Sequence, residues 1–283
     1  MSKKKKVIIA VAISVILALV IWGIHDNLAL ETNGYTIVSQ KLPDSFVGYR
    51  IAQVSDLHNA QIGKDNEKLI KMLKQNNPDV IAITGDIIDS RHTNIEVALD
   101  FAEKAVEIAP CYYVAGNHES RIEEYDEFEQ NLQDIGVVVL NDEQISLTKN
   151  GETIELMGLL DPTFETDDLS VDGENIVKQK LDKMIFDGNE FTVLLAHRPE
   201  LFEIYSSYDI DLVVSGHTHG GQVRLPFIGS LAVPSQGFFP KYDAGEYSNG
   251  NTKMIISRGI GNSMVPLRIN NPPEIVLIEL KKP

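Results

Sequence analysis

The feature that most constrains the fold of this chain is a repeated order of short apolar run, polar motif and amphipathic segment. Asp56, Asp86 and Asn117 each follow such a run and are separated by 30 and 31 residues, which is about the length of one β-α-β unit. Helical spacing of apolar residues predicts the helices that follow at 66–76, 95–109 and 122–135. The alternation predicts an α/β fold with parallel strands, whose carboxyl ends meet in one crevice.

The later part of the chain mixes hairpin-like strands with further strand-and-motif segments. The Asn150-Gly151 turn makes the strands around it an expected antiparallel meander. We expect strands at 35–38, 51–54, 80–83, 112–114, 137–140, 145–147, 153–156, 192–197, 212–217, 254–257 and 275–280. The other expected elements are a surface loop at 161–172, a helix at 174–186 and a loop at 226–240.

The N-terminus combines a lysine cluster with an uninterrupted apolar stretch. Residues 1–6 contain Lys3 to Lys6, and residues 7–24 carry no charge. As a helix this stretch is about 27 Å long, close to the hydrocarbon thickness of a bilayer. We interpret it as an uncleaved, single-pass transmembrane anchor in the cell membrane, because no convincing small-residue cleavage site follows it. Positive charge tends to stay in the cytoplasm, which predicts a basic cytoplasmic tail and an extracytoplasmic catalytic domain.

Length, charge and cysteine content narrow the class of protein. After residues 25–48, a connector with a first strand, residues 49–283 are expected to form one catalytic domain. The formal net charge is −16, and without Lys3 to Lys6 the remaining 21 basic and 41 acidic residues give −20. Such a domain repels polyanions, so we expect no nucleic-acid partner. The single Cys111 is expected to be buried, and no feature indicates an oligomeric state.

Side chains that bind metals gather at the predicted strand ends. Five of the seven histidines lie at such ends, a placement that scattered structural histidines would not follow. A mixed nitrogen and oxygen donor set suits Zn, Mn or Fe, and the lack of cysteine argues against a structural zinc site. The set exceeds the needs of one tetrahedral ion, so we expect two divalent metal ions that share a carboxylate. The residues concerned are Asp56, His58, Asp86, Asn117, His118, His197, His217 and His219.

Five short motifs in order resemble the calcineurin-like metallophosphoesterase superfamily. Its pattern is D-x-H, G-D-x-x-D, G-N-H-E/D, a single H and G-H-x-H, and the match spans about residues 50–222. The Gly-His-Thr-His-Gly-Gly-Gln version of the last motif and the apolar N-terminus resemble membrane-anchored bacterial phosphodiesterases of the YkuE/YaeI type. The expected fold is then a four-layer α/β/β/α sandwich of two mixed sheets flanked by helices, plus one N-terminal transmembrane helix. The blocks are Asp56-Leu57-His58, Gly85-Asp86-Ile87-Ile88-Asp89, Gly116-Asn117-His118-Glu119, His197 and Gly216-His217-Thr218-His219.

The resemblance also implies a role for each of these residues. A hydroxide that bridges the two ions would attack phosphorus while the ions hold the phosphoryl oxygens. His118 would protonate the leaving oxygen or steady the transition state, and Asp89 would orient His118. The glycines beside the last two histidines would leave backbone room for a phosphate. The first metal ion would take Asp56, His58 and His219, the second Asn117, His197 and His217, and Asp86 would bridge them.

A few positions depart from the superfamily pattern or fall outside it. Many members follow the second block directly with Arg-Gly, whereas Ser90 and then Arg91 follow it here. A phosphate-binding role for Arg91 is therefore no better supported than a solvated loop position. Arg258 is left open between binding phosphate and capping a turn. His25 and His92 match no block and are expected to be surface residues.

The predicted function is metal-dependent phosphoester hydrolysis, with a phosphodiester of a phospholipid or the cell envelope as substrate. The alternatives are a phosphomonoesterase or nucleotidase with the same ions, and a non-catalytic membrane-anchored binding protein, against which the full ligand set argues. The phenylalanines of residues 226–240 allow two interpretations. They contact acyl chains or the bilayer surface near the site, or they fold onto the core. The sequence identifies neither the metals nor the physiological substrate.

Overall fold

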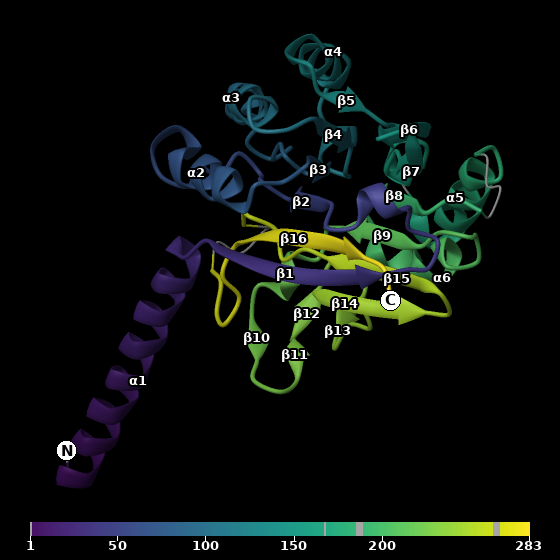
Figure 1. The fold of residues 1–283 in the computed structure, drawn as a ribbon. Helices are drawn as coiled ribbons and strands as arrows, with labels where there is room; N and C mark the ends of the chain where they lie inside the picture. The colour runs from purple at the N-terminus through teal and green to yellow at the C-terminus, as the bar shows by residue number, and fades with distance from the viewer. Residues whose placement is uncertain (1, 167, 185–188, 263–266) are drawn as a thin grey trace.

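Two β-sheets packed face to face form the centre of the molecule, and helices cover both outer faces (Figure 1). This architecture comes from a computed structural model that describes residues 2–166, 168–184, 189–262 and 267–283, without the side chains of residues 19 and 170. The four-layer α/β/β/α sandwich of two mixed sheets predicted from the sequence is confirmed.

The first sheet has six strands, and in it the first strand of the chain pairs with the last. Its strand order is β1-β16-β2-β3-β4-β5. β16 runs parallel to β1 and antiparallel to β2, and all other neighbours are parallel. Its strands are β1 (Glu31–Val38), β2 (Arg50–Val54), β3 (Val80–Thr84), β4 (Cys111–Val114), β5 (Val138–Val139) and β16 (Glu274–Lys281).

The second sheet also has six strands and is mixed. Its order is β14-β15-β9-β8-β7-β6. The central strands are parallel, and the two outer pairs, β14 with β15 and β6 with β7, are antiparallel. The strands are β6 (Glu143–Lys149), β7 (Glu152–Leu159), β8 (Thr192–Ala196), β9 (Leu212–Ser215), β14 (Gly245–Asn249) and β15 (Thr252–Ile256).

Three apolar layers hold the sandwich together because side chains alternate between the two faces of a strand. In β3, Ile81 and Ile83 pack toward the helices of the first sheet, whereas Val80 and Ala82 pack between the sheets. Both faces are therefore apolar, as expected for parallel strands buried on two sides. The first sheet is covered by α2 (Glu67–Asn76), α3 (Ile95–Val106) and α4 (Tyr125–Ile135), the second by α5 (Glu174–Leu181) and α6 (Phe202–Tyr205).

Some local predictions differ from the structure. Residues 137–140 were expected to open an antiparallel meander, and this is wrong, because β5 pairs parallel with β4 in the first sheet. The chain leaves α4 as a third β-α-β crossover, which returns it beside the preceding strand. The meander is confined to β6 and β7. The helix expected at 174–186 ends at Leu181, and residues 185 and 186 lie outside the described residues.

The segment at 226–240 is more ordered than the predicted loop. It contains two short antiparallel hairpins that lie between β9 and the edge strand β14 in the sequence. Its side chains face both ways, since Val233 is buried whereas Phe238 is exposed. The hairpin strands are β10 (Arg224–Leu225), β11 (Gly229–Ser230), β12 (Ala232–Val233) and β13 (Gly237–Phe238).

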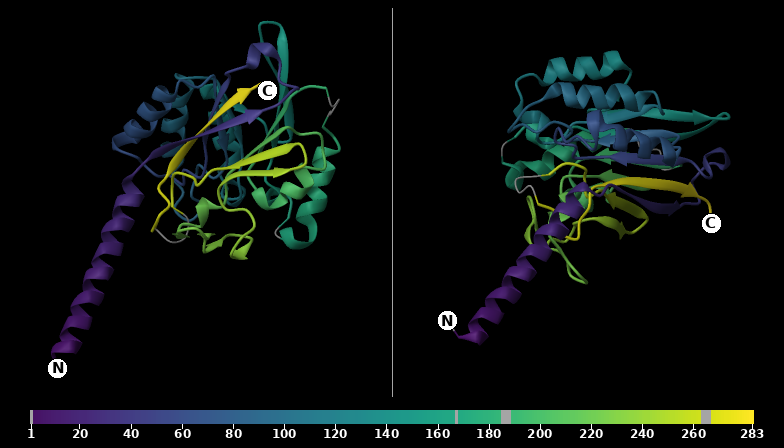
Figure 2. Two further views of the ribbon diagram at one scale, coloured as in Figure 1. Left: turned by 60° about the horizontal axis from the view of Figure 1, so that its bottom comes forward. Right: turned by 90° about the vertical axis from the view of Figure 1, so that its left-hand side faces the viewer.

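The N-terminal helix α1 (Lys3–Leu28) stands clear of the sandwich in each view (Figure 2). Within the described chain it is the one helix long and apolar enough to cross a membrane, by length and composition. Among the residues that the structure describes, its C-terminal end is the part held by the domain. The carboxylate of Asp26 accepts the backbone N–H of Asn270, and a Cβ added to Gly23 would lie 2.7 Å from Cδ1 of Leu267.

The parallel strands of both sheets end at the same edge of the sandwich. Gln53 of β2 links them, since its amide donates to Thr84 Oγ1 at 2.8 Å and to the carbonyl of Ser215 at 2.7 Å. Thr84 ends β3 and Ser215 ends β9, so this buried amide joins the two sheets where their polar motifs begin. This joint fixes the loops that carry the predicted metal ligands.

Candidate metal centre

Most of the predicted ligands lie on sharply turned backbone just after a strand. Left-handed φ angles occur at Asp56 (52°), His58 (45°), Asp86 (52°), His217 (72°) and His219 (50°). Such conformations cost about 1–3 kcal/mol each for residues other than glycine, and they persist only where the surroundings enforce them. Here the backbone enforces them, because Asp56 N–H donates to the carbonyl of Gly85 and His58 N–H to that of Asp86, both at 3.0 Å.

The first group of metal-binding side chains is Asp56, His58 and His219, all of them buried. His58 Nε2 and His219 Nε2 are 3.0 Å apart, and His219 Nε2 is 3.4 Å from Asp56 Oδ1. His219 Nδ1 lies 3.3 Å from the carbonyl of Gly261, so a proton on Nδ1 leaves Nε2 free as a donor to a metal. Three donor atoms therefore converge on one point.

The second group is Asp86, His197 and His217, and it is equally buried. His217 Nδ1 lies 3.2 Å from His197 Nε2, which in turn lies 3.2 Å from Asp86 Oδ2. His197 Nδ1 donates to the carbonyl of Thr84 at 2.7 Å, which leaves Nε2 unprotonated in the neutral ring. The two histidines of the last motif thus lie in different groups, as the sequence led us to expect.

Asp86 lies between the two groups. One carboxylate oxygen, Oδ2, is 3.2 Å from Nε2 of His197 and 3.7 Å from Nε2 of His58. The other oxygen, Oδ1, accepts the backbone N–H of His118 at 2.7 Å, which fixes the orientation of the carboxylate. A single side chain can therefore reach ions held by either group.

The donor atoms fit divalent metal ions. Asn117 Oδ1 is buried without a hydrogen-bond partner, as expected for an atom that binds a cation. His58 Nδ1 is likewise without a partner, while His58 Nε2 faces the cluster. The set combines imidazole nitrogens with carboxylate and amide oxygens and contains no thiolate, a combination that suits Zn, Mn or Fe.

Burial opposes the charges of Asp86 and His197, but their mutual attraction outweighs it, raising the pKa of His197 to about 10 and lowering that of Asp86 well below its usual range. Burial dominates the electrostatics of the other groups. It raises the pKa of Asp56 to about 7 and lowers the pKa of His58 to about 3. It also lowers the pKa of His217 and His219 well below the usual range. A cation among these groups reverses the effect on the carboxylate, because it favours ionised carboxylates beside neutral imidazoles.

His118 borders the same cleft, but its nearest neighbour differs from the expected one. Ser90 contacts His118 Nδ1 through both its backbone N–H and its hydroxyl, each at 3.1 Å. Asp89 Oδ1 is farther away, at 3.5 Å, and the Asp89 carboxylate is engaged by the guanidinium of Arg91 at 2.7 and 2.9 Å. Because the Ser90 N–H donates to Nδ1, the neutral ring of His118 carries its proton on Nε2.

Sequence reasoning missed two buried charged residues that support the cluster. Glu119, quoted in the third motif without a role, accepts backbone N–H groups from Asp86, Ile88 and Gly116. Arg198, which directly follows His197, pairs with Asp161 at 2.8 Å. Asp161 was expected in a surface loop but is 2% exposed. Adjacency to a motif was the only sequence signal for either residue.

The structure also describes the surroundings of residues outside the motif blocks and of one motif glycine. Arg258 pairs with Glu274 of β16 at 3.0 Å and with Glu31 of β1 at 3.3 Å. It therefore links two neighbouring strands of the first sheet. His25 and His92 are exposed. Among the glycines, Gly216 packs against protein atoms, since a Cβ there would lie 2.4 Å from Asp56 Oδ2. The room predicted for a phosphate is thus not provided by this glycine.

A cleft of about 240 Å³ opens over the predicted ligands. A second cavity of about 480 Å³ lies beside it and shares Leu169, Arg198 and Ser235 with it. The second cavity is also lined by Leu201 and Glu200. The cleft itself is lined by Asp86, Asn117, His118, Arg121, Thr163, Leu169, Arg198, His217, His219, Pro234 and Ser235.

Buried imidazoles and carboxylates at the joined strand ends of two mixed sheets define a metal-dependent hydrolase. The chain belongs to the calcineurin-like phosphoesterase family, whose profile matches residues 49–221. The resemblance noted from the five motifs is therefore confirmed, and the protein is a metal-dependent phosphoesterase.

Relatives of this chain agree with this membership. The chain is 32% identical over 262 residues to the uncharacterized metallophosphoesterase YkuE of Bacillus subtilis, covering 89% of this chain and 86% of that protein. It is 27% identical to the phosphodiesterase YaeI of Escherichia coli, covering 84% of each. It is 29% identical to a transmembrane protein with a metallophosphoesterase domain of Danio rerio, covering 86% of this chain and 55% of that protein.

Proposed function

We propose that the protein is a membrane-anchored phosphodiesterase that works with two divalent metal ions, Mn, Zn or Fe. The position of Asp86 Oδ2 between Nε2 of His197 and Nε2 of His58 supports the two-ion part of this proposal. When bound, the ions would supply Lewis acidity and a water of lowered pKa. The first ion would bind Asp56, His58 and His219, the second Asn117, His197 and His217, with Asp86 shared.

His118 would donate a proton to the oxygen of the leaving group. Its Nδ1 accepts the Ser90 N–H at 3.1 Å, so the neutral ring offers its Nε2 proton to an oxygen in the cleft. Burial lowers the pKa of His118, which makes the neutral ring the resting form. Asp89 would act on His118 more weakly than expected, at 3.5 Å, and would mainly hold Arg91.

One observation favours a diester over a monoester substrate. The cavity of about 480 Å³ beside the cleft gives room for a second ester substituent. The cations of the cleft do not decide between the two. Arg198 is already neutralised by Asp161 at 2.8 Å and Glu200 at 3.1 Å, but Arg121 also lines the cleft and could bind the terminal oxygens of a dianionic monoester. A phosphomonoesterase with the same ions is therefore the second candidate.

The membrane part of the proposal rests on α1. Its apolar side chains are exposed along the helix, and Lys3 to Lys6 lie at its far end. Exposed apolar helices of this length are stable in a bilayer, and the lysines favour a cytoplasmic N-terminus. The catalytic domain would then lie outside the cytoplasm, facing phospholipids and other phosphodiesters of the cell envelope.

The test uses bis-aryl and mono-aryl phosphates with the detergent-solubilised full chain and added Mn or Zn. We expect hydrolysis of the bis-aryl ester to be faster, whereas preference for the monoester would favour the second candidate. Asp86→Ala should lose both bound metal and turnover. His118→Ala should keep its metal and lose turnover on poor leaving groups, while the exposed control His92→Ala changes neither. Full activity of His118→Ala on a poor leaving group would exclude its role as an acid.

A further inference from the structure

Residues 225–240 form an uncharged, largely apolar segment in a chain of which 23% is charged. The segment contains no Asp, Glu, Lys or Arg. Its large side chains point outward, since Ile228 is 63%, Phe238 77% and Phe239 65% exposed, and Phe227 is fully exposed. Of the two interpretations left open by the sequence, folding onto the core is therefore wrong for these side chains. A contiguous group of exposed apolar side chains marks an interaction surface.

The backbone holds these side chains outward. Phe227 and Phe239 both adopt left-handed φ angles, 67° and 53°, which are uncommon for bulky residues and indicate an enforced conformation. Asp243 fixes the base of the first hairpin, because its carboxylate accepts the Ser230 N–H at 2.8 Å and pairs with Arg224 at 3.1 Å. The tip of the first hairpin is therefore held in place by polar contacts at its base rather than by packing of its aromatic ring.

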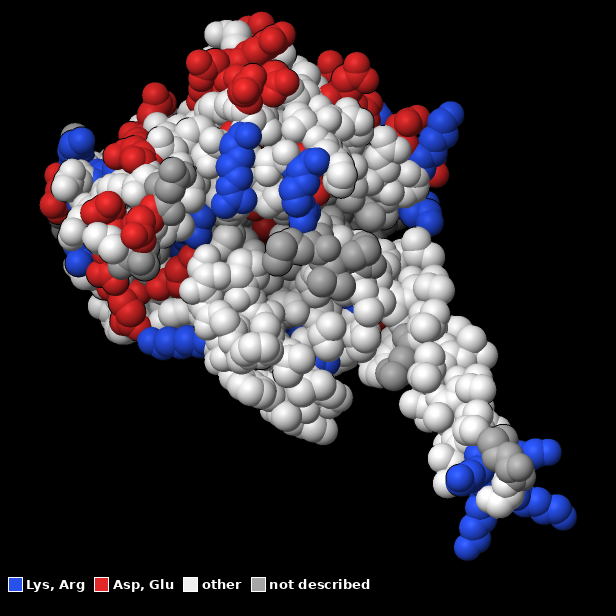
Figure 3. Space-filling model, turned by 180° about the vertical axis from the view of Figure 1, so that it is seen from behind, with Lys and Arg blue, Asp and Glu red and all other residues white. Residues whose placement is uncertain are grey.

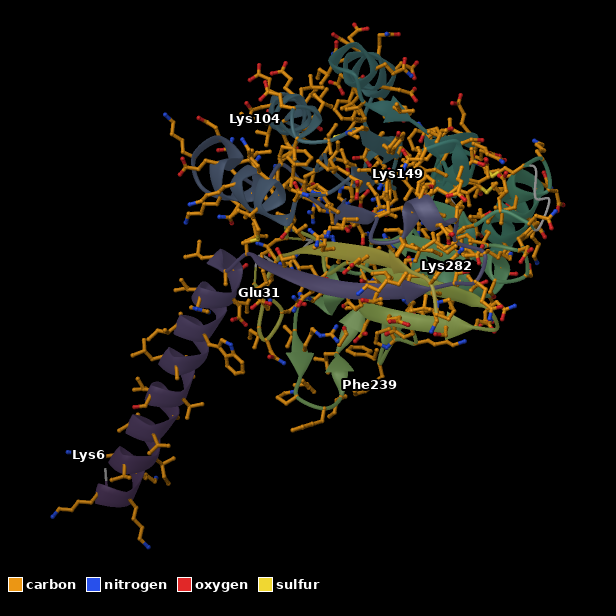
Figure 4. The ribbon with its side chains drawn as sticks, in the orientation of Figure 1. Lys6, Glu31, Lys104, Lys149, Phe239 and Lys282 are labelled. Atoms are coloured by element: carbon orange, nitrogen blue, oxygen red, sulfur yellow. The ribbon has the colours of Figure 1, made fainter. Side chains whose placement is uncertain are left out.

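The same hairpins lie beside the end of α1. The carbonyl of Ile269 accepts the N–H of Arg224 at 3.0 Å, and Asn270 Nδ2 reaches the carbonyl of Arg224 at 3.4 Å. Asn270 also donates its backbone N–H to Asp26 of α1. Figure 4 shows Phe239 on the lower side of the domain, the side toward which α1 projects. A short chain of contacts thus connects the helix to the hairpins.

The charged side chains are distributed as expected if the side of the domain beside α1 faces a membrane. Figure 3 shows acidic side chains gathered over the upper part of the domain, while the lower protrusion beside α1 is mostly uncharged on the visible face. Placing the acidic side against a bilayer would be unfavourable, because its charged carboxylates would lose their contact with water. The uncharged segment 225–240 can therefore enter a bilayer at low cost.

The second hairpin also reaches the metal centre. Its turn residues Pro234 and Ser235 line the catalytic cleft, and Ser235 Oγ lies 3.3 Å from Nε2 of His217. Phe238 and Phe239 follow only a few residues later and are exposed. One short segment therefore joins a predicted metal ligand to the apolar surface, so a substrate held at that surface lies close to the cleft.

We propose that two exposed apolar groups insert into the surface of the bilayer that anchors α1. They are Leu225, Phe227 and Ile228 at the turn of the first hairpin, and Phe238 and Phe239 at the end of the second hairpin away from its turn; together they are called the apolar tips. The cleft then lies at the membrane interface and takes the phosphodiester of a lipid in the adjacent leaflet. This inference rests on the membrane-anchored phosphodiesterase proposed above. Apolar side chains drive the docking, so it does not depend on anionic lipids.

The first test measures where the tips lie, independently of activity. Nitroxide labels are attached at Phe227→Cys and Phe239→Cys in the full chain carrying Cys111→Ala, reconstituted in phosphatidylcholine vesicles. Val138→Cys is the matched control, an exposed apolar position, 40% exposed, on β5. We expect the tip labels to be relaxed by oxygen and shielded from a water-soluble nickel chelate, and the control label to show the reverse.

Each other outcome overturns the docking. Tip labels accessible to the nickel chelate would show that the hairpins remain in water. Tip labels shielded from both oxygen and nickel would show that protein, such as a second copy of this chain, covers them instead. Adding phosphatidylglycerol to the vesicles should leave the pattern unchanged, and a strong dependence on it would contradict apolar docking.

The second test asks whether the docking serves catalysis. Phe227→Ser combined with Ile228→Ser should reduce kcat/KM for a vesicle-embedded phosphodiester by about tenfold or more, since two apolar side chains leave the bilayer. The same variant should hydrolyse a soluble bis-aryl phosphate within about twofold of the native rate, because neither residue lines the cleft. Val138→Ser should change neither. Equal loss on both substrates, or no loss on the lipid, would refute the inference, whereas a native protein inactive on both would refute the proposed function and leave the label experiment to decide the docking.

Discussion

Replacing Glu119 by glutamine tests whether one buried carboxylate holds the strand-end loops of the metal centre together. Oε2 of Glu119 accepts the N–H groups of Asp86 and Gly116 at 2.9 Å each, and Oε1 accepts that of Ile88 at 3.1 Å. Glutamine keeps the shape but offers one acceptor oxygen instead of two. When that oxygen replaces Oε2, the amide NH₂ faces the Ile88 N–H, and a buried donor loses its partner.

The size of the effect follows from these contacts. Burial raises the pKa of Glu119 to about 8, so unfolding is measured above that pH, where the carboxylate is charged. A hydrogen bond to a charged acceptor contributes about 1.5–3 kcal/mol, and a buried donor without a partner costs about 1–3 kcal/mol. We therefore expect Glu119→Gln to lower the free energy of unfolding by about 2–4 kcal/mol. Glu119→Ala removes the acceptor of all three N–H groups and should cost about 4–6 kcal/mol, limited by water that enters the cavity.

The assay is urea unfolding of the detergent-solubilised full chain, followed by circular dichroism. A chelator is present, because bound metal would add stability through mass action. Glu123→Gln, an exposed glutamate in the same loop, is the control and should change the free energy of unfolding by less than about 0.5 kcal/mol. A loss for Glu119→Gln no larger than that of the control would refute the structural role of this carboxylate.

Three further predictions concern charge, reactivity and metal. Arg198→Ala leaves the buried Asp161 unpaired and should lower the free energy of unfolding by about 3–5 kcal/mol in the same urea assay. Burial raises the pKa of Cys111 to about 12, so the thiol stays protonated at neutral pH and should react with a maleimide only after denaturant is added. A chelator should lower the Tm, and free Mn or Zn at about 1,000 times its Kd should restore about 4 kcal/mol of stability. An unchanged Tm would contradict metal binding in the folded state.

The convergence of the site could be predicted because it depends on local order and on sheet topology. Asp56, Asp86 and Asn117 each follow a parallel strand, and one β-α-β unit separates each from the next, so their meeting at one edge follows from the fold. Residues 137–140 show the limit of this reasoning. Their apolar run fits a hairpin or a parallel edge strand equally well, and the crossover through α4 decides between them.

Partners that come from distant loops could not be predicted. Asp161 lies in an acidic stretch typical of a surface loop, and its burial depends on Arg198, which is 37 residues later in the chain. Ser90 could not be identified as the neighbour of His118 for the same reason, since 28 residues separate them. The phenylalanines of residues 226–240 are the opposite case, because apolar composition predicts burial and the structure exposes them.

Gly216 shows what the last motif requires of its first residue. A Cβ there would lie 1.9 Å from Ser55 Oγ and 2.4 Å from Asp56 Oδ2, and Ser55 Oγ already donates to that carboxylate oxygen at 2.6 Å. Gly216→Ala must therefore displace Asp56, and we expect metal affinity to fall by about 10–100-fold, as for other changes to residues that orient ligands. Gly34→Ala is a matched control without left-handed backbone, because the nearest atom to its Cβ would be 4.0 Å away. Titration of the chelator-treated full chain with Mn or Zn measures both. If Gly216→Ala binds metal as tightly as Gly34→Ala, the close approach of Gly216 to Asp56 does not matter for metal binding.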